Sequence, residues 1–70
     1  MTAAELTAAR EALKLRREEL AAVLGVDPSS VRRWEAVGTR TAQKVPHLVA
    51  LAVNGFLAGY RPPGWPPRPD

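Results

Sequence analysis

The clearest pattern in the sequence is a pair of short amphipathic segments on either side of Gly25. Before the glycine, apolar residues recur at spacings of three and four, and after it Val31 and Trp34 lie three residues apart. Such spacings place apolar side chains on one face of an α-helix. The pattern therefore predicts helices over residues 17–24 and 28–36. The predicted core positions are Leu20, Ala21, Val23, Leu24, Val31 and Trp34.

Local signals mark where these two helices begin and end. Gly25 ends the first, because glycine adopts the positive φ that a sharp turn requires. Asp27 followed by Pro28 starts the second, since aspartate caps free amides and proline is tolerated at the first helical position. Glu18 and Glu19 fall in the first turn of the earlier helix, where negative charge suits the helix dipole, and we interpret both as surface residues.

Two further helices are predicted around this pair. Thr2 and Glu5 match a capping box, which predicts a helix from residue 3 to residue 13 or 14. A last helix opens at Pro46 and runs to Leu57. The polar stretch before it is a predicted loop with room for a short helical turn. The sequence therefore predicts an all-α fold of four to five helices.

Apolar residues occupy most of the circumference of the last helix. A helix that is apolar nearly all round must be covered on more than one side. One interpretation places one face in the core and another in a dimer interface; the alternative is full burial within one copy of the chain. The candidate interface residues are Leu48, Leu51, Ala52 and Phe56.

The end of the chain is rich in proline, with five prolines in residues 60–70. Proline fixes φ and lacks an amide hydrogen, which excludes a helix or a central strand and favours extended polyproline II. We therefore divide the chain into a helical domain, residues 1–59, and an extended tail, residues 60–70. For Trp65 three interpretations are open: it folds back onto the last helix, it bridges to another subunit, or the tail is disordered.

Composition narrows the classes of function. The chain has no cysteine and a single histidine, His47, so neither a disulfide framework nor a Cys/His metal site can form. No carboxylate pair is accompanied by a nucleophile or a ligand set, so we expect no enzyme, no cofactor and no small-molecule ligand. The longest largely apolar run falls short of the roughly 20 residues that a membrane span needs, and no signal-peptide pattern opens the chain. We expect a cytoplasmic protein without a membrane partner.

The charge is concentrated in the middle of the chain. The net charge is +3, and residues 14–44 hold seven basic and four acidic side chains. That excess equals the whole net charge, so the basic footprint belongs to the central pair of helices.

A short helix, a glycine turn and a second short helix form a geometry that leaves the outer face of the second helix free for the major groove of DNA. Here that face carries Ser29, Arg32 and Arg33. Arginine can donate a bidentate pair to guanine, which discriminates against a wrong base by about 1–3 kcal/mol. The two arginines are adjacent and diverge by about 100° around the helix. We expect both to contact DNA, one reading bases and the other holding phosphate; the alternative is a solvated helix face.

Residues 15–35 resemble the phage Cro and repressor type of helix-turn-helix domain, the Xre-type family. The residues that carry the resemblance are Glu18-Glu19-Leu20-Ala21, Leu24-Gly25-Val26 and Val31-Arg32-Arg33-Trp34-Glu35. It implies a compact five-helix, lambda-repressor-like domain with the helix-turn-helix at 17–36. It also implies base reading by Ser29, Arg32 and Arg33, and a structural ion pair between Arg10 and Glu35. The positions that it assigns to the DNA backbone are Arg17, Ser30, Thr39, Arg40 and Lys44.

Three residues depart from the family pattern. Arg16 stands where serine, threonine or asparagine usually caps the second helix, a contact worth about 1 kcal/mol. Arg17 replaces a common glutamine, and Lys14 replaces the glycine usual after the first helix, which costs strain if this residue takes positive φ. Arg16 and Arg17 together form a basic pair beside the expected DNA backbone, so we interpret both as phosphate contacts.

The implied function is that of a transcriptional regulator, a repressor that occupies a double-stranded DNA operator as a homodimer in a bacterial or phage-infected cell. A Cro-like phage switch, an autorepressor, an antitoxin and an anti-CRISPR-associated regulator stay open as contexts. The competing hypothesis is a protein-interaction module on the same scaffold, which uses the apolar last helix and the Pro/Trp tail.

Overall fold

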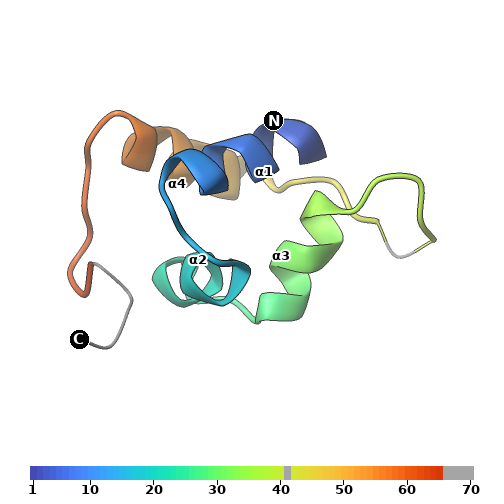
Figure 1. Cartoon of the computed structure of the whole chain (residues 1–70), viewed down its shortest axis with the longest axis horizontal. Coiled ribbons are helices and arrows are strands. Elements are labelled where there is room, and N and C mark those ends of the chain that lie inside the picture. Colours follow the sequence, from blue (N-terminus) through green and yellow to red (C-terminus); the bar gives the residue numbers. More distant parts are fainter. Residues whose placement is uncertain (41, 66–70) are drawn as a thin grey trace.

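The computed structural model describes residues 1–40 and 42–65, and every regular element within these ranges is an α-helix. The helices are α1 (Ala3–Ala12), α2 (Arg17–Leu24), α3 (Pro28–Glu35) and α4 (His47–Leu57). α1 and α4 lie side by side in one layer, and α2 and α3 form the other (Figure 1). The all-α prediction is confirmed. A fifth helix is absent from the described residues: between α3 and α4 they form one turn, in which the Ala42 amide donates to the Thr39 carbonyl at 3.3 Å.

The start of α1 is a complete capping box. The Thr2 hydroxyl accepts a hydrogen bond from the Glu5 amide at 3.1 Å, and the Glu5 carboxylate accepts one from the Thr2 amide at 2.7 Å. Two amide groups that the helix itself cannot satisfy are paired in this way. The predicted start of the first helix is therefore confirmed, and its end lies one or two residues earlier than predicted.

Lys14 makes the turn between α1 and α2 in a left-handed conformation, with φ of 59°. Its amide donates to the Glu11 carbonyl at 2.9 Å, and the next amide, of Leu15, donates to the Arg10 carbonyl at 3.1 Å. A side chain with a Cβ atom is strained in this region by about 1–2 kcal/mol. The strain expected for a lysine at a position that favours glycine is thus present.

We expect Lys14→Gly to raise the free energy of unfolding by about 1 kcal/mol, because glycine adopts positive φ without steric cost. Chemical denaturation followed by circular dichroism would measure it. Lys14→Ala is the matched control, since it removes the charge but keeps the Cβ atom, and it should bring no gain. Equal stabilities of the two variants would contradict this account.

The core lies where the two layers meet. Its largest fully buried side chains come one from each helix: Leu6, Leu20, Val31 and Val53. Trp34, at 7% exposure, packs in the same cluster. Gly25 has φ of 72° and ends α2 as predicted, which turns the chain so that α3 packs against both α1 and α2. The packing therefore fixes the inner face of α3 and leaves its outer face to solvent.

α4 is covered on one side only. Ala50, Val53 and Phe56 are buried, whereas Leu48 is 78% exposed and Leu51 is 54% exposed. The alternative of full burial within one copy is therefore wrong. The assignment of Phe56 to an interface is also wrong, because its side chain is only 4% exposed and belongs to the core. Pro46 stands at the N-cap position without a side-chain capping hydrogen bond and is not the first residue of the helix.

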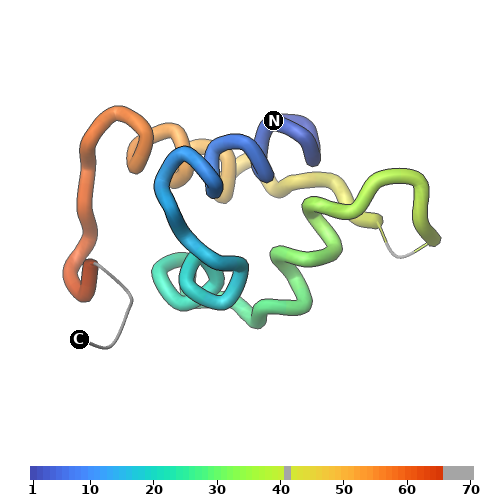
Figure 2. The backbone as a smooth tube through the Cα atoms, in the orientation of Figure 1, coloured from blue at the N-terminus to red at the C-terminus, as the bar shows by residue number. Residues whose placement is uncertain are grey.

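The tail folds back onto α4. After α4 the chain turns and runs down the side of the molecule, as the orange and red part of the tube shows (Figure 2). Arg61 donates from Nη1 to the carbonyls of Phe56 at 2.6 Å and Tyr60 at 2.9 Å, and its guanidinium lies 4.7 Å from the centre of the Trp65 ring. The Trp65 ring centre lies 5.4 Å from that of Phe56. Of the three interpretations of Trp65, this agrees with the first. Residues 66–70 lie outside the described residues, and a domain boundary at residue 59 stays a prediction.

Candidate nucleic-acid interface

α3 is built from strong local signals. The Asp27 carboxylate accepts a hydrogen bond from the Ser29 amide at 2.8 Å, and Pro28 occupies the first helical position. Hydrogen bonds from Ser29 hold the pKa of Asp27 below its usual value. The helix ends at Glu35, because Ala36 is extended. Both signals predicted for the start of this helix are confirmed.

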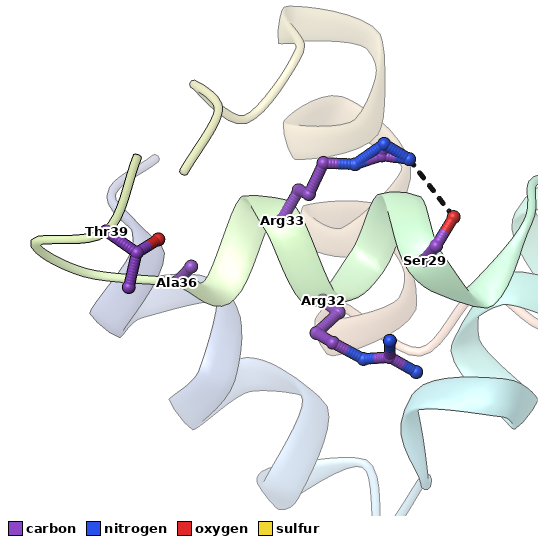
Figure 3. Close-up of a pocket in the computed structure, with 5 residues that line it drawn as sticks. All are labelled: Ser29, Arg32, Arg33, Ala36 and Thr39. Carbon is purple, nitrogen blue, oxygen red and sulfur yellow. Dashed lines mark hydrogen bonds between the residues drawn. The ribbon is translucent and has the colours of Figure 1, made fainter. Parts of the chain in front are cut away.

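The outer face of α3 carries the three residues that are predicted to read bases. Arg32 is exposed, and Arg33 and Ser29 are half-buried. Arg33 donates from Nη2 to the Ser29 hydroxyl at 3.1 Å, while Arg32 leaves the helix in another direction (Figure 3). A hollow of about 450 Å³ lies over this face. Its lining residues are Ser29, Arg32, Arg33, Ala36 and Thr39.

Arg33 is the more constrained of the two arginines. Its Nε atom is buried and has no hydrogen-bond partner in the part of the chain that the structure describes. Its carbonyl accepts hydrogen bonds from the Gln43 amide at 3.0 Å and the Ala36 amide at 3.4 Å, which ties the following loop to α3. Arg33 is thus held along the helix, whereas Arg32 is free to reach outward.

This arrangement of helices agrees with a known family. A family model described as Helix-turn-helix matches residues 6–53, a range that includes α2, the Gly25 turn and α3. The chain belongs to the helix-turn-helix family. The resemblance to the Xre-type family is thereby confirmed, and the fold is one that binds DNA. Comparisons with curated proteins and with solved structures give no match.

The residues assigned to the DNA backbone in this helix-turn-helix chain are distributed around α3. Arg16 and Arg17 stand at the start of α2, with side chains 72% and 49% exposed. Ser30 is half-buried in the first turn of α3. The other three, Thr39, Arg40 and Lys44, are exposed in the segment between α3 and α4.

Glu35, at the end of α3, holds two arginines. Arg10 donates to it from Nε at 2.7 Å and from Nη2 at 3.2 Å, which is the pair implied by the resemblance. Arg17 donates to it from Nε at 3.1 Å, a contact that the sequence analysis missed. Burial raises the pKa of Glu35, but the hydrogen bonds from the two arginines outweigh it, and the pKa lies below its usual value.

These carboxylates make the fold of the helix-turn-helix protein sensitive to acid. The pKa values of Glu5, Asp27 and Glu35 are all lowered in the folded state. Such groups stabilise the fold above their unfolded pKa values, about 4, and this stabilisation is lost as the pH falls through the folded values. We expect the free energy of unfolding to be lower at pH 3 than at pH 7. Denaturation at the two pH values would measure the difference, and equal values would contradict it. Asp27→Asn keeps a good helix cap without the titrating group and should lose less stability in acid.

Glu19 was also misjudged from the sequence, since its side chain is 4% exposed and not on the surface. Its carboxylate accepts a hydrogen bond from the Arg16 amide at 2.6 Å and lies 3.5 Å from Arg16 Nε. The start of α2 therefore keeps half of a capping box, although arginine has no acceptor that could complete it. The glutamate three residues after the cap was the signal that could have indicated this.

In residues 1–40 and 42–65 there is no cluster of three or more potential metal ligands of the His, Cys, Asp or Glu type. None of the four described helices is long and apolar enough to cross a membrane.

Proposed function

We propose that this helix-turn-helix protein is a sequence-specific regulator of transcription that represses by occupying a double-stranded DNA operator, with α3 in the major groove. The observation that carries the proposal is the outer face of α3, where an exposed Arg32 lies beside the coupled pair of Arg33 and Ser29. Exposed basic residues on either side of α3 in the chain supply the charge that DNA backbone contacts require.

Within this proposal the two arginines have different tasks. Arg32 has the freedom to present both terminal nitrogens to a guanine edge in the major groove. Arg33 is restrained by Ser29 and contributes from a fixed position. Arg16, Arg17, Ser30, Thr39, Arg40 and Lys44 contact phosphates and set the register of the helix.

Selection of bound sites from a random duplex library tests the proposal. We expect recovery of an inverted repeat whose half-sites lie about one helical turn, roughly 34 Å, apart. Recovery of no enriched sequence would contradict sequence-specific binding.

We also propose that two copies pair through α4. Its exposed face presents Leu48 and Leu51, with the half-buried Ala52 beside them, and α4 contains no Asp, Glu, Lys or Arg. Two such faces can pack about a two-fold axis without repulsion between like charges, and the pairing would stabilise a small domain. The same two leucines also favour the alternative function, a protein-interaction module. Binding to DNA distinguishes the two functions, because only the regulator requires it.

Leu51→Glu tests this pairing, because it places a charge at the centre of the proposed interface. We expect it to weaken dimerisation at least tenfold (about 1.4 kcal/mol) in sedimentation equilibrium, measured with the selected duplex as well as without it. Leu57→Glu is the matched control: Leu57 is 47% exposed but lies about 240° around the helix from Leu51. Equal behaviour of both variants and the wild type would rule out this interface.

A further inference from the structure

The Glu35 carboxylate binds two arginines in different ways. Arg10 uses all three of its nitrogens: Nε and Nη2 donate to Glu35, and Nη1 donates to the Leu15 carbonyl at 2.9 Å. Its side chain is only 12% exposed. Arg10 is therefore committed to the fold, since each of its three nitrogens already donates to an acceptor within the chain.

Arg17 uses only the inner edge of its guanidinium. Its Nε donates to Glu35 Oε1 at 3.1 Å, and no hydrogen bond from its terminal nitrogens is found among the described residues. Its side chain is 49% exposed. The guanidinium is a rigid planar fork, so fixing Nε also fixes the direction of the two terminal nitrogens. Arg17 is thus held at one edge and open at the other.

We propose that Glu35 is a positioning residue for DNA binding: it holds Arg17 by Nε so that the terminal nitrogens meet a phosphate of the DNA backbone. This inference rests on the proposed function and adds a task to a carboxylate that the family resemblance assigns to structure alone. Arg10, Arg17 and Glu35 together carry a charge of +1, so the cluster still attracts an anion. A fork fixed in advance loses less freedom when it binds than a mobile side chain does.

Glu35 connects the phosphate contact of Arg17 to the end of the reading helix. Glu35 is the last residue of α3, and Arg17 is the first residue of α2. A phosphate bound by Arg17 is therefore tied to the end of the reading helix, which fixes how α3 lies in the groove. Arg16 stands at the same helix start but is held less closely than Arg17, because its Nε lies 3.5 Å from Glu19 and its side chain is 72% exposed.

Arg17→Lys and Arg17→Gln test the inference in the whole 70-residue chain. Arg61→Lys is the matched control, because Arg61 is an exposed arginine held by the carbonyls of Phe56 and Tyr60 and has no proposed contact with DNA. Affinity for a duplex that carries the selected site is measured by fluorescence anisotropy over a range of salt concentrations, below the melting temperature of every variant. Lysine keeps the charge, but its single ammonium group cannot hold Glu35 with one edge and a phosphate with another. We expect about fivefold weaker binding for Arg17→Lys and a salt slope smaller by about 0.9, the value for one lost phosphate contact. Arg17→Gln should show the same loss of slope, and Arg61→Lys should stay within about twofold of the wild type.

The outcomes separate the two proposals. A wild-type protein without salt-sensitive affinity for any duplex would overturn the proposed function and this inference with it. If the wild type binds DNA and Arg17→Lys keeps the affinity and slope of the wild type, Arg17 acts only as a charge and the positioning role is wrong. A melting temperature that falls in Arg17→Lys while the slope stays unchanged would show a purely structural pair, and would also overturn the inference.

Discussion

Replacement of Glu35 by alanine is expected to lower the free energy of unfolding by about 3–5 kcal/mol. The side chain is 2% exposed and accepts hydrogen bonds from both Arg10 and Arg17. Its loss leaves the guanidinium of Arg10, itself largely buried, without a counter-ion. A domain of this length has about 4–10 kcal/mol of stability in total, so the substitution should remove a large fraction of it.

Urea denaturation followed by circular dichroism measures this effect. Glu18→Ala is the control, because Glu18 is an exposed carboxylate next to Arg17 and should change the free energy of unfolding by no more than about 0.5 kcal/mol. A Glu35→Ala variant as stable as Glu18→Ala would show that the ion pairs contribute nothing measurable to the fold.

The second large effect concerns recognition. Arg32→Ala is expected to weaken binding to the selected duplex by about 5- to 150-fold, the range that corresponds to 1–3 kcal/mol for a bidentate contact with guanine. Because Arg32 is exposed, its removal should leave the stability of the domain within about 0.5 kcal/mol of the wild type. A loss of binding without a loss of stability would assign the effect to the contact with DNA.

Arg40→Ala is the matched control for Arg32→Ala. Arg40 is an exposed arginine in the loop after α3, and its proposed partner is a phosphate. Its removal should weaken binding to all duplexes alike, whereas loss of Arg32 should relax the preference at one base pair. If both variants weakened all duplexes equally, Arg32 would not read sequence.

The starts of α1 and α3 and the end of α2 could be predicted from the sequence because each is set by neighbouring residues. The capping box at Thr2 and Glu5, the glycine at position 25 and the Asp27-Pro28 start all act over three residues or fewer. Such signals require no knowledge of how the helices pack. The inner positions Val31 and Trp34 followed from helical periodicity for the same reason.

The features that were missed depend on contacts between distant elements. Arg17 and Glu35 are 18 residues apart and meet only because α2 and α3 cross in the folded chain. Phe56 is buried partly by Trp65, which reaches it from a tail whose proline content predicted only an extended shape. Spacing along one helix carries no information about either contact. The roles of individual residues in base reading and phosphate binding stay predictions, because they concern a partner outside the chain.

The central claim is that the outer face of α3 reads DNA sequence. The most direct test is a competition measurement in which the selected duplex and a scrambled duplex of equal length compete for the wild type and for the double variant Arg32→Ala, Arg33→Ala, at several salt concentrations. We predict that the wild type prefers the selected duplex at every salt concentration, and that the double variant, still folded by circular dichroism, binds both duplexes weakly and equally. A folded double variant that keeps the preference of the wild type would contradict the account.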